Sequence, residues 1–182
     1  MGIIIVSIVV VFLTVWAISC QRRLAVMDEN VNNAMVQIGV QLSSRFDALT
    51  ALLDLTREYA DHESQTLIET IKFRRSVITA TSTPNDVLKQ EGVIFEALSR
   101  ISMVAEQCSE LKANVNYARY MNAVDSYEKM VQTSRLIYND SVTKLNRELR
   151  MFPGSLLGVV FGFRQRDYLE AVEANADMSG MR

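Results

Sequence analysis

The sequence predicts an all-α protein. One N-terminal transmembrane helix continues into a long antiparallel bundle of three to four helices, and a short apolar segment follows. Three observations lead to this fold class. An uncharged apolar run occupies the N-terminus, apolar residues recur at helical spacing along the chain, and glycine and proline number only 7 and 2 among 182 residues. So few turn-forming residues favour long helices over strands joined by frequent turns.

The N-terminal run from Ile3 to Cys20 reads IIIVSIVVVFLTVWAISC and carries no charge. About 18 or more such residues are enough to cross the hydrocarbon core of a membrane as a helix. A helix is expected because a lone span must satisfy every backbone amide internally. We expect membrane contact along the run and at its basic flank, from Ile3, Val9, Phe12, Trp16, Arg22 and Arg23.

The flanking charges predict an orientation. Met1 and Gly2 precede the run without a basic residue, whereas Arg22 and Arg23 follow it. Cytoplasmic flanks are enriched in lysine and arginine within about 15–20 residues of a span. We therefore expect the N-terminus outside and the bulk of the chain in the cytoplasm.

Two processing alternatives compete with a retained span. A cleaved secretory signal would need a basic segment before the apolar run, and this segment is missing. Cys20 follows the small residue Ser19, as in a lipoprotein signal, but Ala17 is unfavourable three positions before such a cysteine. Lipidation of Cys20 is left open as a minor alternative.

The composition excludes several function classes. The net charge of −2 implies no general attraction to nucleic acid. The 2 cysteines, one of them at the end of the apolar run, do not form a disulfide framework and fit a reducing compartment.

The first helix of the bundle is predicted to continue directly from the span. Its apolar stripe alternates steps of three and four residues and consists of Val31, Met35, Ile38, Leu42, Leu49, Leu52 and Thr56. The helix either runs straight on or kinks at residues 59–62, where Asp61 is placed to cap a new start. We expect it to end near residues 81–86.

Two further helices follow, each with a local start signal. Thr83 before Pro84 combines an N-cap hydroxyl with proline at the first helical position. The second helix weakens near residues 108–114, where Asn114 is placed to cap the third. The third is expected to stop before Phe152-Pro153-Gly154.

Residues 152–173 form a distinct apolar and aromatic segment, too short at about ten apolar residues to span a membrane. Its glycines recur at every fourth position and would form a flat helix stripe that permits close backbone approach. The residues expected in an interaction surface are Gly154, Gly158, Phe161, Gly162, Phe163 and Tyr168.

Two uses of this segment remain open. It docks onto a second copy, a partner or the membrane interface, where the flanking arginines would lie near lipid phosphates. Alternatively it folds onto its own bundle as a cap, since such small-residue patterns are also common by chance.

Catalytic motifs are absent from the sequence. It has no phosphate-cradling glycine loop, no HExxH or CxxC motif, and a single histidine, His62. Tyr59, Asp61, His62 and Glu63 form the one dense polar cluster, for which a structural hydrogen-bonding role at a helix break is expected. We expect no enzyme activity, no cofactor, no metal and no small-molecule substrate.

Several strings resemble hallmarks of the LemA family in that family's order. They are AMVQIGVQL (34–42), RFD (45–47), YADHE (59–63), LKAN (111–114), YND (138–140), Phe152-Pro153 and the stretch from Phe161-Gly162-Phe163 to Tyr168. The chain departs from the family at Met35, where tryptophan is usual, and at Ser44, where a basic residue is usual. It also lacks the family's proline near Thr50, so we expect a straighter first helix.

The resemblance implies a single-span helical protein of the bacterial cytoplasmic membrane, with its N-terminus outside. It implies no defined reaction. We divide the chain into an anchor (1–22), a LemA-like bundle (23–151), the apolar segment (152–173) and a flexible tail (174–182).

Together these observations predict a non-enzymatic membrane scaffold that self-associates or organises a membrane patch. The alternative is an adaptor that presents a helical surface to a membrane enzyme or sensor. The partners expected are the lipid bilayer, further copies of the chain and a membrane protein, with no nucleic acid.

Overall fold

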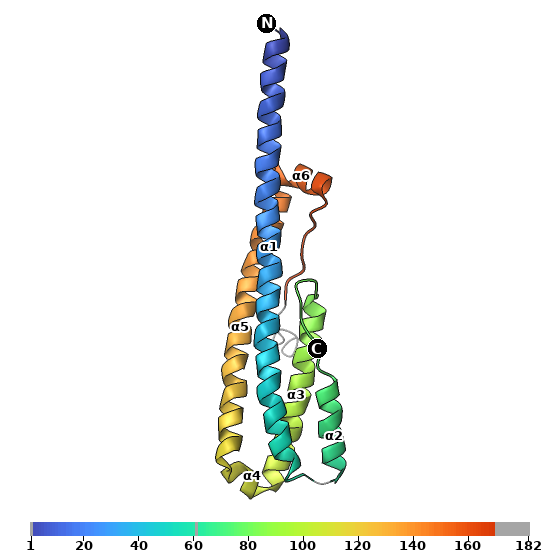
Figure 1. Cartoon of the computed structure of the whole chain (residues 1–182), viewed down its shortest axis with the longest axis vertical. Coiled ribbons are helices and arrows are strands. Elements are labelled where there is room, and N and C mark those ends of the chain that lie inside the picture. The colour runs from blue at the N-terminus through green and yellow to red at the C-terminus, as the bar shows by residue number, and fades with distance from the viewer. Residues whose placement is uncertain (1, 61, 170–182) are drawn as a thin grey trace, which may run out of the picture. The chain divides into compact units, whose positions relative to one another are not determined.

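The computed structural model describes residues 2–60 and 62–169, which form helices without any strand (Figure 1). The all-α prediction is therefore confirmed. The helices of this part of the chain are α1 (Gly2–Arg57), α2 (His62–Phe73), α3 (Pro84–Gln107), α4 (Ser109–Ala113), α5 (Val115–Arg150) and α6 (Gly154–Phe161).

The chain divides into two compact units whose boundaries fall within α1 and α5. Unit 1 comprises residues 1–34 and 137–182, and unit 2 comprises residues 35–136. This division differs from the sequence segments proposed above, because unit 1 joins two stretches that are distant in sequence. The tail from 174 to 182 lies outside the described residues.

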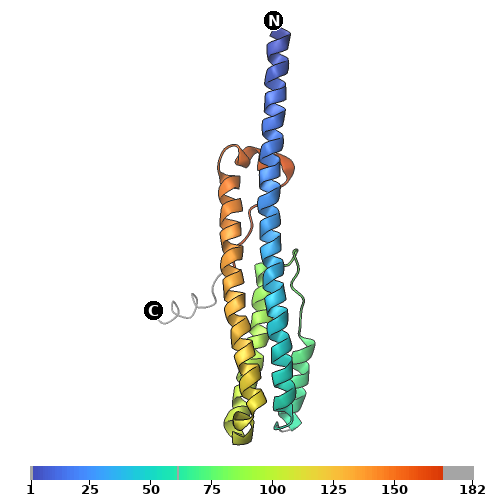
Figure 2. The same ribbon diagram turned by 60° about the vertical axis from the view of Figure 1, so that its left-hand side comes forward.

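In unit 1 the N-terminal part of α1 lies beside the C-terminal part of α5, and the two run in opposite directions (Figure 2). Arg23 of α1 pairs with Glu148 of α5 at 3.0 Å. The apolar run of α1 is largely exposed, whereas one side of the helix beyond it is buried. The buried apolar side chains of unit 1 include Leu24, Val31, Ala34, Tyr138, Val142, Leu145 and Leu169.

The α1 helix is uninterrupted between Cys20 and Val31 and also through Thr50. The prediction of a straight course at Thr50 agrees with this, and the Thr50 hydroxyl donates to the Phe46 carbonyl at 2.8 Å. Cys20 is buried within the helix.

In unit 2 the first helix ends at Arg57, and α2 returns beside it. Of the two alternatives left open at residues 59–62, the structure adopts the break. The side-chain amide of Gln65 donates to the carbonyls of Arg57 at 3.3 Å and Ala60 at 3.1 Å. These bonds satisfy carbonyls that the end of α1 leaves without helical partners. Glu69 of α2 then pairs with Arg57 at 2.9 Å.

Residues 74–83 are not helical, so the expectation of helix up to residues 81–86 is wrong there. The reason is tertiary. A Cβ on Gly39 would lie 2.4 Å from the carbonyl oxygen of Ile78, so only glycine lets this segment approach α1 so closely. Arg75 also pairs with Asp47 at 2.6 Å and lies over the Phe46 ring, 5.4 Å from its centroid.

The two later helix starts are confirmed. Thr83 and Asp86 form a capping box at the start of α3, with Pro84 in the first turn. Asn114 caps α5 by accepting a hydrogen bond from the Asn116 amide at 2.9 Å. Within unit 2, α5 runs opposite to both α1 and α3 (Figure 1).

Candidate interaction surfaces

The N-terminal run is the one segment of the described chain that is long and apolar enough to cross a membrane. The side chains expected to face lipid are exposed: Ile3, Val9, Phe12 and Trp16 by 84, 49, 70 and 38%, respectively. Arg22 and Arg23 beyond them are exposed as well.

The hydroxyl groups within this run are satisfied by the helix itself. Ser7, Thr14 and Ser19 each donate to the carbonyl four residues earlier, at 2.9, 2.8 and 2.9 Å. A hydroxyl bonded in this way adds no unsatisfied polar group to the apolar surface.

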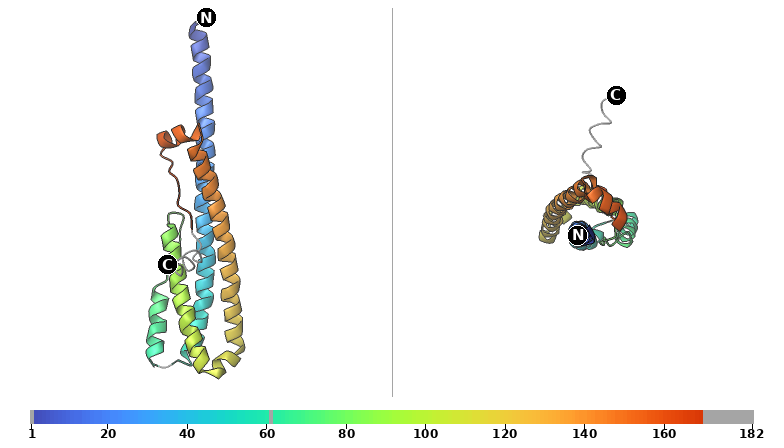
Figure 3. Two further views of the ribbon diagram at one scale, coloured as in Figure 1. Left: turned by 180° about the vertical axis from the view of Figure 1, so that it is seen from behind. Right: turned by 90° about the horizontal axis from the view of Figure 1, so that it is seen from above.

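The short helix α6 turns across the end of α5 in unit 1 (Figure 3). Its glycines lie against residues of α5. A Cβ on Gly154 would lie 2.2 Å from the carbonyl oxygen of Glu148, and one on Gly158 would lie 2.5 Å from Cδ2 of Leu149. Both glycines are buried. Their spacing thus serves contact within the chain, which is the cap alternative, and they are not exposed for docking.

Gly162 has a different role. Its φ of 80° lies in the left-handed region, and its amide donates to Val159 at 3.3 Å while the Phe163 amide donates to Gly158 at 2.9 Å. This is a glycine C-cap, in which the left-handed residue lets the last carbonyls of a helix be satisfied. Gly162 therefore ends α6.

Four other residues of α6 form an exposed apolar surface. Leu156, Val159, Val160 and Phe161 are 62, 81, 69 and 45% exposed. We call these four residues the α6 apolar face. Burying such a side chain fully is worth about 1.5–3 kcal/mol, so leaving several together in water is unfavourable. Contiguous exposed apolar surface of this kind marks contact with a protein or a membrane.

The residues just before α6 lie against the apolar run of α1. The Phe152 ring, just before α6, lies 6.2 Å from the Trp16 ring, measured between centroids, with the planes tilted by 40°. Phe163 is half-buried and Tyr168 is 45% exposed. The α6 apolar face is thus joined through Phe152 to the end of the N-terminal run.

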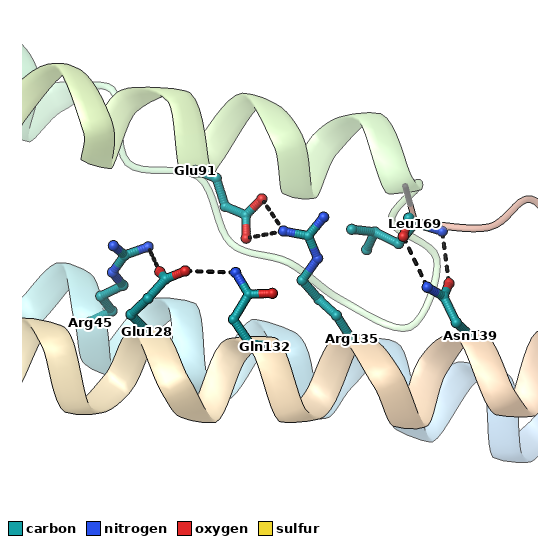
Figure 4. A network of polar contacts seen from close by, with 7 residues as sticks. All are labelled: Arg45, Glu91, Glu128, Gln132, Arg135, Asn139 and Leu169. Atoms are coloured by element: carbon teal, nitrogen blue, oxygen red, sulfur yellow. Dashed lines mark hydrogen bonds and ion pairs between the residues drawn. The ribbon is translucent and has the colours of Figure 1, made fainter. Parts of the chain in front are cut away.

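After α6 the chain returns along α5 in extended form, and two asparagines of α5 bind its backbone. Asn146 donates to the carbonyl of Arg166 and accepts from its amide, both at 2.9 Å. Asn139 does the same with Leu169, again at 2.9 Å (Figure 4). Each asparagine thereby pairs with a main chain as a neighbouring β-strand would.

The spacing explains why both bonds form. Two helical turns, which separate Asn139 from Asn146, rise about 11 Å. Three residues of extended chain, from Arg166 to Leu169, rise about 10 Å. The Tyr138 hydroxyl adds a bond to the Asp167 carbonyl at 3.0 Å. Burial raises the pKa of Tyr138, so its phenol keeps the proton that it donates.

The returning segment also ties α5 to α1. The Arg166 guanidinium donates to Asp28 at 2.9 Å and to Asn32 at 3.3 Å. We call the contacts of Asn139, Asn146 and Arg166 the C-terminal clasp. The sequence did not predict the clasp, because its only signal there is two asparagines on one face of the predicted third helix.

Unit 2 contains a buried cluster of charged side chains from three helices (Figure 4). Arg135 of α5 donates to both carboxylate oxygens of Glu91 on α3 at 3.1 Å. Their side chains are only 6 and 11% exposed. Arg45 of α1 pairs with Glu128 of α5, which also accepts from Gln132 at 2.7 Å.

The electrostatics of Glu91 reflect this environment. Burial raises the pKa of Glu91, and Arg135 opposes that shift by favouring the carboxylate. Glu128 adds to the increase in the pKa of Glu91 and Arg45 reduces it. The arrangement holds α1, α3 and α5 in register within unit 2.

The predicted polar cluster near His62 is described only in part. Asp61, and the side chains of His62 and Glu63, lie outside the described structure. The Tyr59 hydroxyl accepts from the Asn114 amide at 3.4 Å, and its ring packs against buried residues of α3 and α4. Across the described residues, no group of three or more His, Cys, Asp or Glu is placed to hold a metal.

Comparison with known proteins agrees with the resemblance noted above. The family model of the LemA family matches residues 34–179, which is most of the chain. No curated protein matches it. The chain belongs to the LemA family.

Proposed function

We propose that this chain is a membrane-anchored, non-enzymatic helical scaffold that self-associates and organises a patch of membrane. One observation carries the proposal. A single unbroken helix of unit 1 carries both the exposed apolar run and the buried residues Leu24, Val31 and Ala34. An anchor built in this way transmits its position and tilt to the packed residues, as a flexible linker would not.

The anchor is proposed to lie in the bacterial cytoplasmic membrane with the N-terminus outside. Its exposed apolar side chains and internally bonded hydroxyls suit a lipid environment. The basic pair Arg22 and Arg23 favours the cytoplasm for the residues that follow.

Self-association is supported by exposed apolar side chains away from the anchor. Val36 and Val40, one turn apart on the α1 part of unit 2, are 40 and 55% exposed. A second copy that covered the two valines would place two anchors in the same membrane patch.

The test is the mass of the particle in a gentle detergent, with the detergent contribution subtracted. We expect two or more copies for the unchanged chain and a shift toward the monomer for the double variant Val36→Gln/Val40→Gln. The control is Val115→Gln, because Val115 is 81% exposed at the start of α5. A strictly monomeric unchanged chain would contradict self-association.

The alternative proposal is an adaptor for a membrane enzyme or sensor. The exposed Phe95 and Met103 on α3 favour it, since both could contact a foreign helix. Crosslinking in membranes followed by purification separates the two. A stoichiometric foreign protein, lost in Phe95→Gln, supports the adaptor, whereas crosslinks between identical chains support the scaffold.

A further inference from the structure

We propose that α6 is a membrane-interface helix that lies in the lipid–water boundary, with its apolar face among the acyl chains. This inference rests on the membrane anchorage proposed above and adds a second point of lipid contact. Interfacial helices lie in the membrane plane with an apolar face buried about 5–10 Å into the boundary.

The composition of α6 suits this position. The helix reads GSLLGVVF and carries no charged side chain. Its glycine edge is taken up by α5, whereas the four residues of the α6 apolar face remain exposed. Met151 and Phe152, exposed by 57 and 77%, extend this apolar surface toward α5.

The position of α6 along α1 within unit 1 identifies lipid as the occupant. Phe152 contacts Trp16, which lies about one helical turn before Cys20, where the apolar run ends. Tryptophan is enriched at this level of membrane spans because its ring is apolar and its N–H is polar. If α1 crosses the membrane, Phe152 and the start of α6 lie at the lipid–water boundary.

The charges around α6 match a lipid headgroup layer. Arg147 and Arg150 precede it and Arg164 follows it, and all three are exposed. Arg23, one turn or so beyond the apolar run, pairs with Glu148 at 3.0 Å. Basic residues beside an apolar face favour anionic phospholipid, whose phosphates attract them while the acyl chains receive the apolar side chains.

A second copy of the chain fits this surface less well. A stable protein interface buries roughly 800 Å² on each partner. An eight-residue helix that already uses one edge against α5 offers much less. The bilayer imposes no such requirement, because it covers whatever apolar surface reaches it.

The experiment places a single tryptophan on α6 in the full-length chain, reconstituted into nanodiscs of phosphatidylcholine and phosphatidylglycerol. The unchanged chain has one tryptophan, Trp16, so its own fluorescence reports on the anchor. The double variant Trp16→Phe/Val159→Trp moves this reporter to α6. Phosphatidylcholine brominated near the headgroup end of its acyl chains then quenches any indole at the boundary.

The matched control is Trp16→Phe/Phe95→Trp, because Phe95 is exposed on α3 to a similar degree as Val159. We expect at least roughly twofold stronger quenching from the α6 position than from the α3 position, as its depth in the boundary requires. Trp16→Phe/Val160→Trp provides a second α6 position, and circular dichroism of each variant verifies the helical fold.

The outcomes separate this inference from the proposed anchorage. Quenching of Trp16 without quenching at either α6 position overturns the interface helix and leaves the anchor in place. Blue-shifted fluorescence without quenching from the α6 tryptophan also overturns it, because protein and not lipid then covers the α6 apolar face. No quenching of Trp16 overturns the anchorage together with the inference. Equal quenching at α3 and α6 contradicts a specific interface position.

Discussion

Unit 1 and unit 2 join distant segments of the chain by different chemistry. In unit 1 the neutral amides of Asn139 and Asn146 bind the main chain of an extended segment. Both units also contain ion pairs between helices, but among the described residues only Arg135–Glu91 of unit 2 is almost fully buried, whereas Arg23–Glu148 of unit 1 has an exposed arginine. The Arg45–Glu128 pair of unit 2 is partly buried. Unit 2 also has a buried amide, Gln90, whose oxygen accepts from the Ser76 amide at 2.8 Å.

The difference follows from what each unit must hold. An extended segment exposes one amide and one carbonyl per residue, and an asparagine side chain satisfies both without regard to the residue that it meets. Packed helices have no free main-chain groups along their length, so only side chains can fix their register. A buried charge pair selects one register because any other leaves a charge unpaired.

The largest effect is expected from breaking the ion pair in unit 2. Arg135→Ala leaves Glu91 buried without the guanidinium that holds it, and loss of one partner of such a pair costs about 3–5 kcal/mol. Urea unfolding of the full chain in detergent measures the change. The control is Arg119→Ala, because Arg119 is exposed on the same helix.

A second variant tests whether the ion pair fixes the register of the helices or adds to the net stability of unit 2. Replacing both partners, as Arg135→Met/Glu91→Leu, removes the charges together, and such replacement is often neutral or stabilising. We expect the double variant to recover most of the stability lost in Arg135→Ala. Equal losses in Arg135→Ala and Arg119→Ala would show that the pair contributes nothing particular to unit 2.

An intermediate, local effect is expected in unit 1. Asn146→Ala removes two hydrogen bonds and leaves the Arg166 amide and carbonyl without this partner, at a cost of about 1–3 kcal/mol. Hydrogen exchange should show faster exchange of the Arg166 amide, with little change in unit 2. Asn33→Ala, at an exposed site of α1, is the control. Uniform destabilisation of both units would contradict a local clasp.

The smallest effect is expected from a contact within one helical turn, the capping box at the start of α3. Hydrogen bonds from the Thr83 backbone amide and hydroxyl hold the pKa of Asp86 below its ordinary value of 3.8. The folded state therefore favours the carboxylate, so its stabilising contribution is present above that value and lost as pH falls through the lower, folded pKa.

Thermal unfolding of Asp86→Asn against pH measures this contribution. We expect the variant to be slightly less stable at neutral pH and to approach the unchanged chain as pH falls below 3.8. A constant difference between the two at every pH would show that the carboxylate charge contributes nothing to the capping box.

Local signals predicted much of the fold. The starts of α3 and α5 follow from Thr83 and Asn114, whose side chains satisfy amides only two or three residues away. The residues 74–83 could not be predicted in the same way. Their extended course depends on Gly39, which is distant in sequence and leaves room for the Ile78 backbone.

The candidate surfaces show the same limit. The sequence indicated that the glycines after Pro153 pack closely against something, but only the structure assigns Gly154 and Gly158 to α5 and Gly162 to the end of α6. It likewise reveals which apolar residues of α6 stay exposed. The clasp was missed because an asparagine in a helix carries no signal of what its amide binds.

The sequence by itself determined the apolar N-terminal run, the helical class and the family, because these depend on composition, periodicity and short strings. Only the tertiary structure decided which edge of α6 is buried, what Asn139 and Asn146 bind, and which charges Arg45 and Arg135 meet. Those choices depend on contacts between residues far apart in the chain, and the free energy of such contacts exists only once the helices have packed.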